Sequence, residues 1–115
     1  MTSKPEKLFD LQELRTIAAG DKGFFSEMIR LFISQNEAAL LDIRTQVAKN
    51  EFSLIKGILH KMKPSIMVMG VNSATEIIKQ VEQLELPAMK EPGFAELLKQ
   101  LETILQEVND QLRKI

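Results

Sequence analysis

Apolar side chains recur at intervals of three and four residues along four long segments, and this spacing restricts the fold more than any other feature. The segments run over about residues 22–49, 51–68, 73–87 and 94–112. Apolar residues at this spacing share one face of an α-helix, and that face must be buried against another element. Because the connections are short, the four helices pack most simply as an antiparallel up-down bundle.

A shorter helix is expected before the bundle, over residues 11–18, where Leu14 and Ile17 lie on the apolar face. Asp10 is a good N-cap for it, and Gly20 offers a stop. The chain has no tryptophan or tyrosine and few β-branched runs, so little favours strands. We therefore expect an all-α fold: an antiparallel up-down four-helix bundle with a short additional N-terminal helix across one end.

Polar and turn residues predict where the longer helices begin and end. Asp21 is placed to cap the second helix, and Asn50 to terminate it. Ser73 and Glu76 have the spacing of a capping box, which predicts the start of the fourth helix. Residues 87–93 hold two prolines and a glycine, so we expect an irregular connection before the last helix.

Composition restricts the function as well as the fold. The 115 residues, 44% of them hydrophobic, are expected to form one domain over residues 1–115. With 15 Lys and Arg residues against 16 Asp and Glu residues, no basic field favours nucleic acid or a membrane surface. The chain has no cysteine, no run near the roughly 20 apolar residues of a membrane helix, and no signal-peptide pattern. We expect a cytoplasmic monomer without direct membrane contact.

The segment over residues 51–68, the third expected helix of the chain, contains its only histidine, His60. The apolar stripe of this segment consists of Ile55, Ile58, Leu59, Met62, Ile66 and Met69. On a helical wheel at about 100° per residue, His60 lies roughly 150° from the centre of that stripe, so its imidazole is expected in solvent. Met67 shares the wheel position of His60 and is a candidate contact for a partner protein.

The residues beside His60 differ in kind on its two flanks. Lys56 and Lys63 lie within about 60° of it on one flank, where their ammonium groups can neutralise an anion. Gly57 and Pro64 lie on the other flank and carry no long side chain. Glycine inside a helix costs about 1 kcal/mol relative to alanine, so close approach of a partner is the better explanation for Gly57.

Residues 60–70 resemble the signature of the histidine-containing phosphotransfer (HPt) domain. In that family a lysine stands three positions after the phosphorylated histidine and a glycine ten positions after it, and Lys63 and Gly70 occupy those places. Residues 24–33 are also similar to the helix that precedes the phosphohistidine helix. The one clear departure is Pro64, where the family usually has glycine.

The resemblance implies that His60 accepts a phosphoryl group from receiver-domain aspartates of response regulators and donates it to others. It gives Lys63 the role of neutralising the phosphoryl oxygens. Glu82 looks like the acid that commonly ends the next helix, where its carboxylate can accept a hydrogen bond from Nδ1 and orient the ring. The Mg²⁺ of the reaction belongs to the receiver, so no metal and no cofactor is expected on this chain. The expected receiver docking face consists of Lys56, Gly57, Pro64 and Met67.

Other functions are less consistent with these residues. One alternative is an HPt-like helical interaction module that carries no phosphate. Phosphorylation of His60 would distinguish a phosphotransfer domain from such a module. An enzyme is disfavoured, because the chain has no phosphate-cradling glycine loop, nucleotide motif or second histidine. The dimerising helices of a histidine kinase also carry a phosphohistidine, but an acidic residue follows it there, whereas Lys61 does here. We favour a phosphotransfer domain from the C-terminal end of a hybrid sensor histidine kinase over a free protein.

Overall fold

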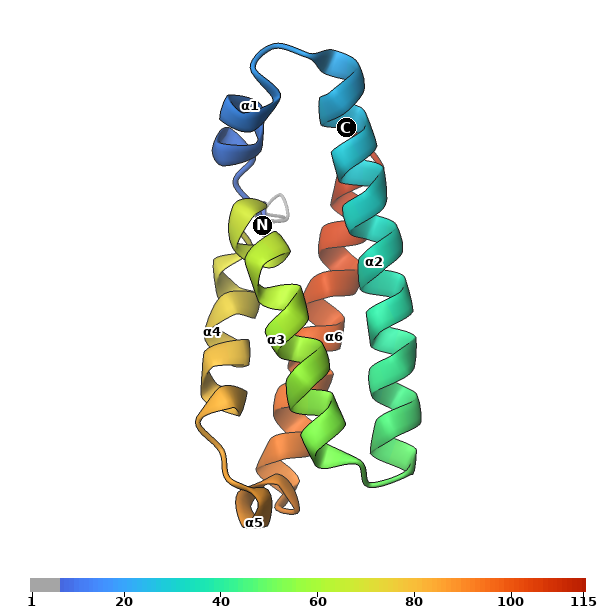
Figure 1. Cartoon of the computed structure of the whole chain (residues 1–115), viewed down its shortest axis with the longest axis vertical. Coiled ribbons are helices and arrows are strands. Elements are labelled where there is room, and N and C mark those ends of the chain that lie inside the picture. Colours follow the sequence, from blue (N-terminus) through green and yellow to red (C-terminus); the bar gives the residue numbers. More distant parts are fainter. Residues whose placement is uncertain (1–6) are drawn as a thin grey trace, which may run out of the picture.

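The structure, a computed structural model, describes residues 7–115 and contains six α-helices and no strand within them. The helices are α1 Gln12–Ala18, α2 Lys22–Ala48, α3 Phe52–Val68, α4 Asn72–Glu82, α5 Leu86–Met89 and α6 Pro92–Leu112 (Figure 1). The predicted all-α fold is confirmed: α2, α3, α4 and α6 form the four-helix bundle, and α1 is the additional N-terminal helix.

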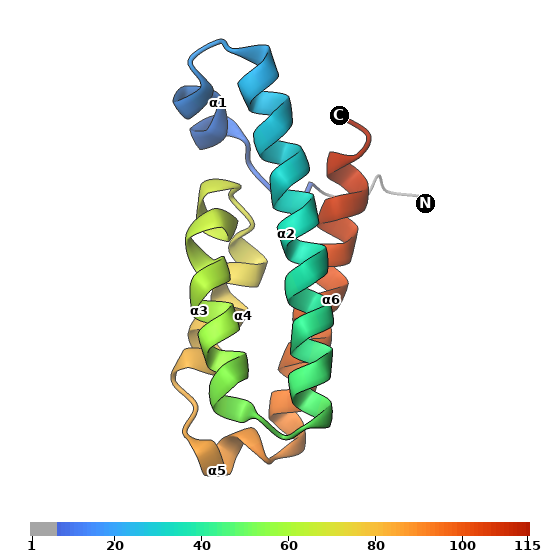
Figure 2. The same ribbon diagram turned by 45° about the vertical axis from the view of Figure 1, so that its right-hand side comes forward.

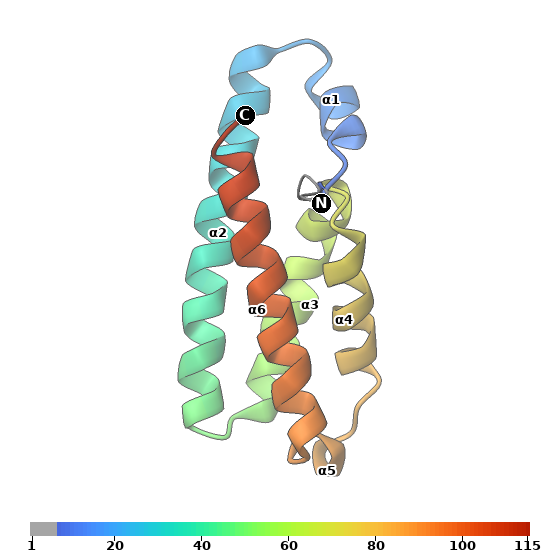
Figure 3. The same ribbon diagram turned by 180° about the vertical axis from the view of Figure 1, so that it is seen from behind.

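The four bundle helices run alternately up and down the long axis of the molecule (Figure 1). Helix α3 packs against α2 and α4, and α6 packs against the same two helices on the opposite side, which closes the bundle (Figure 3). The first turns of α2 extend beyond the turn between α3 and α4, and α1 lies above that turn and packs on α2 (Figure 2). The site described below lies on the α3–α4 pair.

The core is built from the apolar faces that the sequence spacing predicts. The side chains that are fully buried in the bundle helices include Ile55, Leu59 and Ile66 of α3, Ala74, Ile78 and Val81 of α4, and Leu101, Leu105 and Val108 of α6. Two residues that the spacing places on apolar faces, Ile17 and Val47, are instead 52% and 41% exposed. In α1 the buried side chains are Leu14 and Ala18, one turn apart, and Ile17 lies outside that face.

A pair of asparagines lies in the buried part of the contact between α2 and α6. Asn36 and Asn109 are 3% and 2% exposed, and Nδ2 of Asn36 donates to Oδ1 of Asn109 at 3.2 Å. Within residues 7–115 no buried side-chain nitrogen or oxygen lacks a hydrogen-bond partner. Since a buried amide without a partner is costly, this pair favours one register of α2 against α6.

Helix starts depend on turn geometry as much as on capping side chains. Asp21 caps α2 as predicted, accepting a hydrogen bond from a backbone N–H of the first turn at 2.9 Å. The capping box predicted at Ser73 and Glu76 is wrong, because α4 begins at Asn72 and no side chain caps it. The residue at its N-cap, Val71, is fully buried, so the turn places an apolar anchor where a capping side chain would stand.

Two other boundaries differ from the predicted ones. Helix α1 begins one residue later than expected, so its N-cap is Leu11 and not Asp10 as predicted, although Asp10 accepts a hydrogen bond from the Gln12 backbone N–H at 3.0 Å. Residues 87–93 are not a single irregular connection, since Pro87 lies in the first turn of α5 and Pro92 in the first turn of α6. Proline is favoured there because the N–H groups of a first turn have no partner within the helix.

Gly70 fixes the turn between α3 and α4. Its φ is +65°, and the N–H groups of Gly70 and Val71 donate to the carbonyls of Met67 and Ile66 at 3.0 and 3.1 Å, a Schellman arrangement. A Cβ at this position would lie 2.5 Å from the carbonyl oxygen of Asp10, in the segment before α1. Glycine is therefore required both by the left-handed backbone and by the close approach of a second backbone segment.

We predict that Gly70→Ala destabilises the domain more than Gly20→Ala does. Both substitutions force alanine into a left-handed backbone, since φ of Gly20 is +86°, and this costs about 1–2 kcal/mol. A Cβ at Gly20 would meet no atom within 4 Å, whereas a Cβ at Gly70 would meet the Asp10 backbone. Urea titration would measure the free energies of unfolding. Equal losses in the two variants would mean that the contact with Asp10 does not hold the turn.

Candidate functional site

His60 lies near the middle of α3, on the solvent side of the helix. Its side chain is 74% exposed, whereas Ile55, Leu59 and Ile66 on the inner side are fully buried. The solvent exposure predicted from the apolar spacing is therefore confirmed. Because most of the imidazole lies in solvent, its orientation depends on the polar residues beside it.

Glu82, the last residue of α4, is the polar residue that contacts the imidazole. Its Oε2 lies 3.0 Å from Nδ1 of His60, and its Oε1 accepts a hydrogen bond from Nζ of Lys63 at 2.7 Å. The side chains of Glu82 and Lys63 are each 25% exposed, much less than that of His60. A single carboxylate thus bridges two side chains of α3 that stand almost one turn apart.

The contact with Glu82 favours one tautomer of the imidazole. An ionised carboxylate can only accept hydrogen bonds, so Nδ1 must be the ring nitrogen that carries the proton and donates. In the neutral ring the lone pair is then on Nε2, the nitrogen that does not face Glu82. The arrangement therefore presents a nucleophilic nitrogen in a defined orientation on an exposed face.

The same contacts keep Glu82 ionised. The hydrogen bond from His60, together with the one from Lys63, holds the pKa of Glu82 below its ordinary value, although partial burial acts in the opposite direction. Because this pKa is lower than in the unfolded chain, the contacts stabilise the domain above the ordinary pKa of glutamate. That contribution is lost as the pH falls through the lowered value.

Lys56, on the same flank of His60 as Lys63, binds backbone rather than a side chain. It is half-buried, and its Nζ donates to the backbone carbonyl of Leu84 at 2.7 Å, just beyond the end of α4. Its ammonium group is thus bound to backbone on the α4 side. Residue types alone could not predict this acceptor, because a backbone carbonyl exists at every position and only the helix packing selects one.

The other flank of His60 carries no long side chain, as predicted from its residue types. Gly57 and Pro64 are exposed, and a Cβ at Gly57 would meet no atom within 4 Å. No neighbour in the described part of the chain therefore requires glycine at this position. Met67, about two turns after His60 and on the same side of α3, is 51% exposed.

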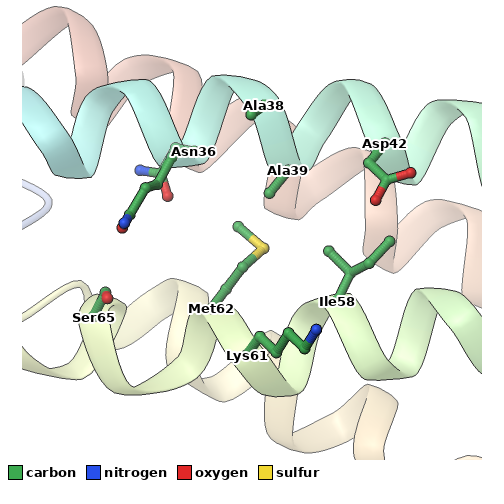
Figure 4. A pocket seen from close by; sticks show the side chains of 9 residues that line it. Asn36, Ala38, Ala39, Asp42, Ile58, Lys61, Met62 and Ser65 are labelled. Carbon is green, nitrogen blue, oxygen red and sulfur yellow. The ribbon is translucent and has the colours of Figure 1, made fainter.

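A groove of about 350 Å³ lies between α2 and α3, and His60 is not among the residues that line it. Figure 4 shows Met62 pointing from α3 toward Ala39 of α2 in this groove. Lys61 also lines it, so this lysine belongs to the α2 side of α3 rather than to the contact with Glu82.

Two negative findings apply to residues 7–115. Their His, Asp and Glu side chains form no group of three or more that could hold a metal ion. No helix among them is both long enough and apolar enough to cross a membrane.

We predict that the pKa of Glu82, followed by NMR at its carboxyl carbon, lies below that of an ordinary glutamate. His60→Ala and Lys63→Ala should each raise this pKa, because each removes one of the two hydrogen bonds that lower it. If the pKa of Glu82 were unchanged in both variants, the bridge would not exist in solution.

The comparisons with known proteins agree with this geometry at the level of the family. The family model of the Hpt domain matches residues 27–111, a range that contains all of α3 and α4 together with His60, Lys63 and Glu82. The chain has no match among curated proteins or solved structures. The chain thus belongs to the Hpt family, whose members carry a phosphoryl group on a histidine in the phosphorelays of two-component signalling.

Proposed function

We propose that His60 carries the phosphoryl group of this domain and relays it between aspartates of receiver domains. The family acts through a histidine, and the chain contains only one. The observation that carries the proposal is the state of its ring, which is 74% exposed and has Nδ1 bonded to Glu82 at 3.0 Å. This leaves Nε2 as the nucleophile without the need for a general base.

The proposed step forms one bond and breaks one bond. The lone pair on Nε2 of His60 attacks the phosphorus of an aspartyl phosphate, an N–P bond forms, and the P–O bond to the aspartate breaks as its carboxylate leaves. The ring then bears positive charge, which the carboxylate of Glu82 at Nδ1 stabilises. Donation to another receiver is the reverse step. Mg²⁺ is supplied by the receiver, and this chain needs no cofactor of its own.

Lys63 is proposed to neutralise the phosphoryl oxygens. Its ammonium group has three N–H donors, of which the contact with Glu82 occupies one. Lys63 can therefore keep that contact and donate a second hydrogen bond to a phosphoryl oxygen on His60, one turn away. The two roles are compatible because both partners of the ammonium are anions.

The proposed partners are receiver domains of response regulators and, as a source of phosphate, a hybrid sensor histidine kinase. Gly57, Pro64 and Met67 form the face on which a receiver would dock, with Lys56 at its edge, and Gly57 and Pro64 leave the backbone of α3 accessible. We expect the domain to act as a monomer in the cytoplasm and to present a nucleophile rather than to work as an enzyme. The alternative is an interaction module without phosphotransfer, and the next experiment would indicate it if the wild-type domain accepted no phosphate.

We predict that His60→Gln abolishes labelling by a cognate receiver that has been charged with acetyl phosphate and Mg²⁺. The melting temperature should stay almost unchanged, because a side chain that is 74% exposed contributes little to stability. Lys61→Gln is the matched control and should accept phosphate normally, since Lys61 lies on the α2 side of α3. Acid-labile phosphate on the His60→Gln variant would contradict the assignment.

Substitution of Gly57 tests the docking face. Gly57→Gln should slow phosphotransfer from the receiver while the domain stays folded, because a long side chain would separate the two surfaces. Gly57→Ala is the control: its Cβ meets no atom within 4 Å, so it should raise the free energy of unfolding by up to about 1 kcal/mol. Stopped-flow transfer rates would decide, and a wild-type rate for Gly57→Gln would exclude close docking here.

A further inference from the structure

Two lysines of α3 bind the same end of α4. Lys56, four residues before His60, donates to the backbone carbonyl of Leu84 at 2.7 Å. Lys63, three residues after His60, donates to the side chain of Glu82 at 2.7 Å. The contact between Nδ1 of His60 and Oε2 of Glu82, at 3.0 Å, stands between them along α3.

A cation bound near the end of α4 can stabilise the last turn of this helix. Helix α4 ends at Glu82, and Leu84 follows the C-cap residue Gln83. The Leu84 carbonyl thus lies just beyond the helix, at the negative end of its dipole, where a bound cation is stabilising. The last turn of a helix is also where it frays most easily. Glu82, which orients His60, stands in this turn.

We propose that Lys56 is a positioning residue for phosphotransfer: it ties the chain two residues after Glu82 to α3 and thereby keeps Glu82 on Nδ1 of His60. This inference rests on the proposed function of His60. Lys56 acts on the position of Glu82 through the backbone that follows α4, since its ammonium binds the Leu84 carbonyl oxygen and the residue is half-buried. This role differs from that of a cation that faces the phosphoryl group.

The proposal predicts a change in the imidazole of the unphosphorylated domain. Lys56→Met keeps the apolar stem of the side chain and removes the ammonium. In nitrogen-15 NMR spectra at a pH where His60 is neutral, this variant should show a smaller fraction of the Nδ1–H tautomer than the wild type. Lys56→Arg, which can still donate to the Leu84 carbonyl, should restore that fraction.

Lys56→Met should also slow phosphotransfer from a charged receiver by about three- to tenfold. Lys79→Met removes the same charge from an exposed position on α4, where Lys79 only pairs with Glu76 at 3.9 Å. It should leave both the rate and the tautomer unchanged, and so controls for net charge. Circular dichroism of each variant would verify that its helices are intact.

A double substitution distinguishes the positioning role from a direct one. If Lys56 acts through Glu82, then Lys56→Met should cause no further loss of rate in a Glu82→Ala background. An equal loss in both backgrounds would mean that Lys56 contacts the phosphoryl group or the receiver directly, and would overturn the proposal. So would an Lys56→Met variant with a lowered melting temperature but a wild-type tautomer and rate. If the wild-type domain accepted no phosphate, the proposed function would fail, while the tautomer measurement would still decide whether Lys56 positions Glu82.

Discussion

The burial of the inner face of α3 determines where the groups of the site can lie. Ile55, Leu59 and Ile66 are completely removed from solvent, and burying one such side chain contributes about 1.5–3 kcal/mol. A rotation of α3 that brought His60 toward the core would expose part of this set and would also bury a polar ring. The outward direction of the imidazole is thus a consequence of the core, and the site needs to control only the rotation of the ring itself.

The position of Glu82 depends on a second constraint, the turn between α3 and α4. His60 stands ten residues before Gly70 and Glu82 twelve residues after it, so at about 1.5 Å per residue the two lie at similar heights on antiparallel helices. The left-handed backbone of Gly70 and the hydrogen bond from the Asp10 N–H to the Met69 carbonyl at 3.1 Å both act on this turn. The segment before α1 therefore supports the register of α3 against α4 without touching the imidazole.

The features that could be predicted from sequence are those that local periodicity encodes. The helical spacing of apolar residues predicted the four-helix bundle, the exposure of His60 and the residues on its two flanks. The antiparallel register of the third and fourth helices predicted that Glu82 could reach the imidazole. The capping box at Ser73 was wrong because sequence spacing alone did not reveal that Val71 is buried at the N-cap of α4. The partner of Lys56 could not be found either, since the acceptor is a backbone carbonyl that becomes available only where α4 ends beside α3. Tertiary contacts to backbone leave no pattern in the residue types.

An anionic residue beside a histidine that is to bear a phosphoryl group needs an explanation, because two negative groups repel each other. The geometry provides two reasons why the repulsion stays small. Glu82 binds Nδ1, whereas phosphate would be carried on Nε2, so the imidazole stands between the two anions and its positive charge is attracted to both. Lys63 binds the second carboxylate oxygen at 2.7 Å and partly cancels the charge of Glu82 on the side that solvent screens least, where both side chains are only 25% exposed. The carboxylate can therefore fix the tautomer more firmly than a neutral acceptor would, because hydrogen bonds to ionised groups are the stronger ones, and Lys63 limits the electrostatic cost of using it.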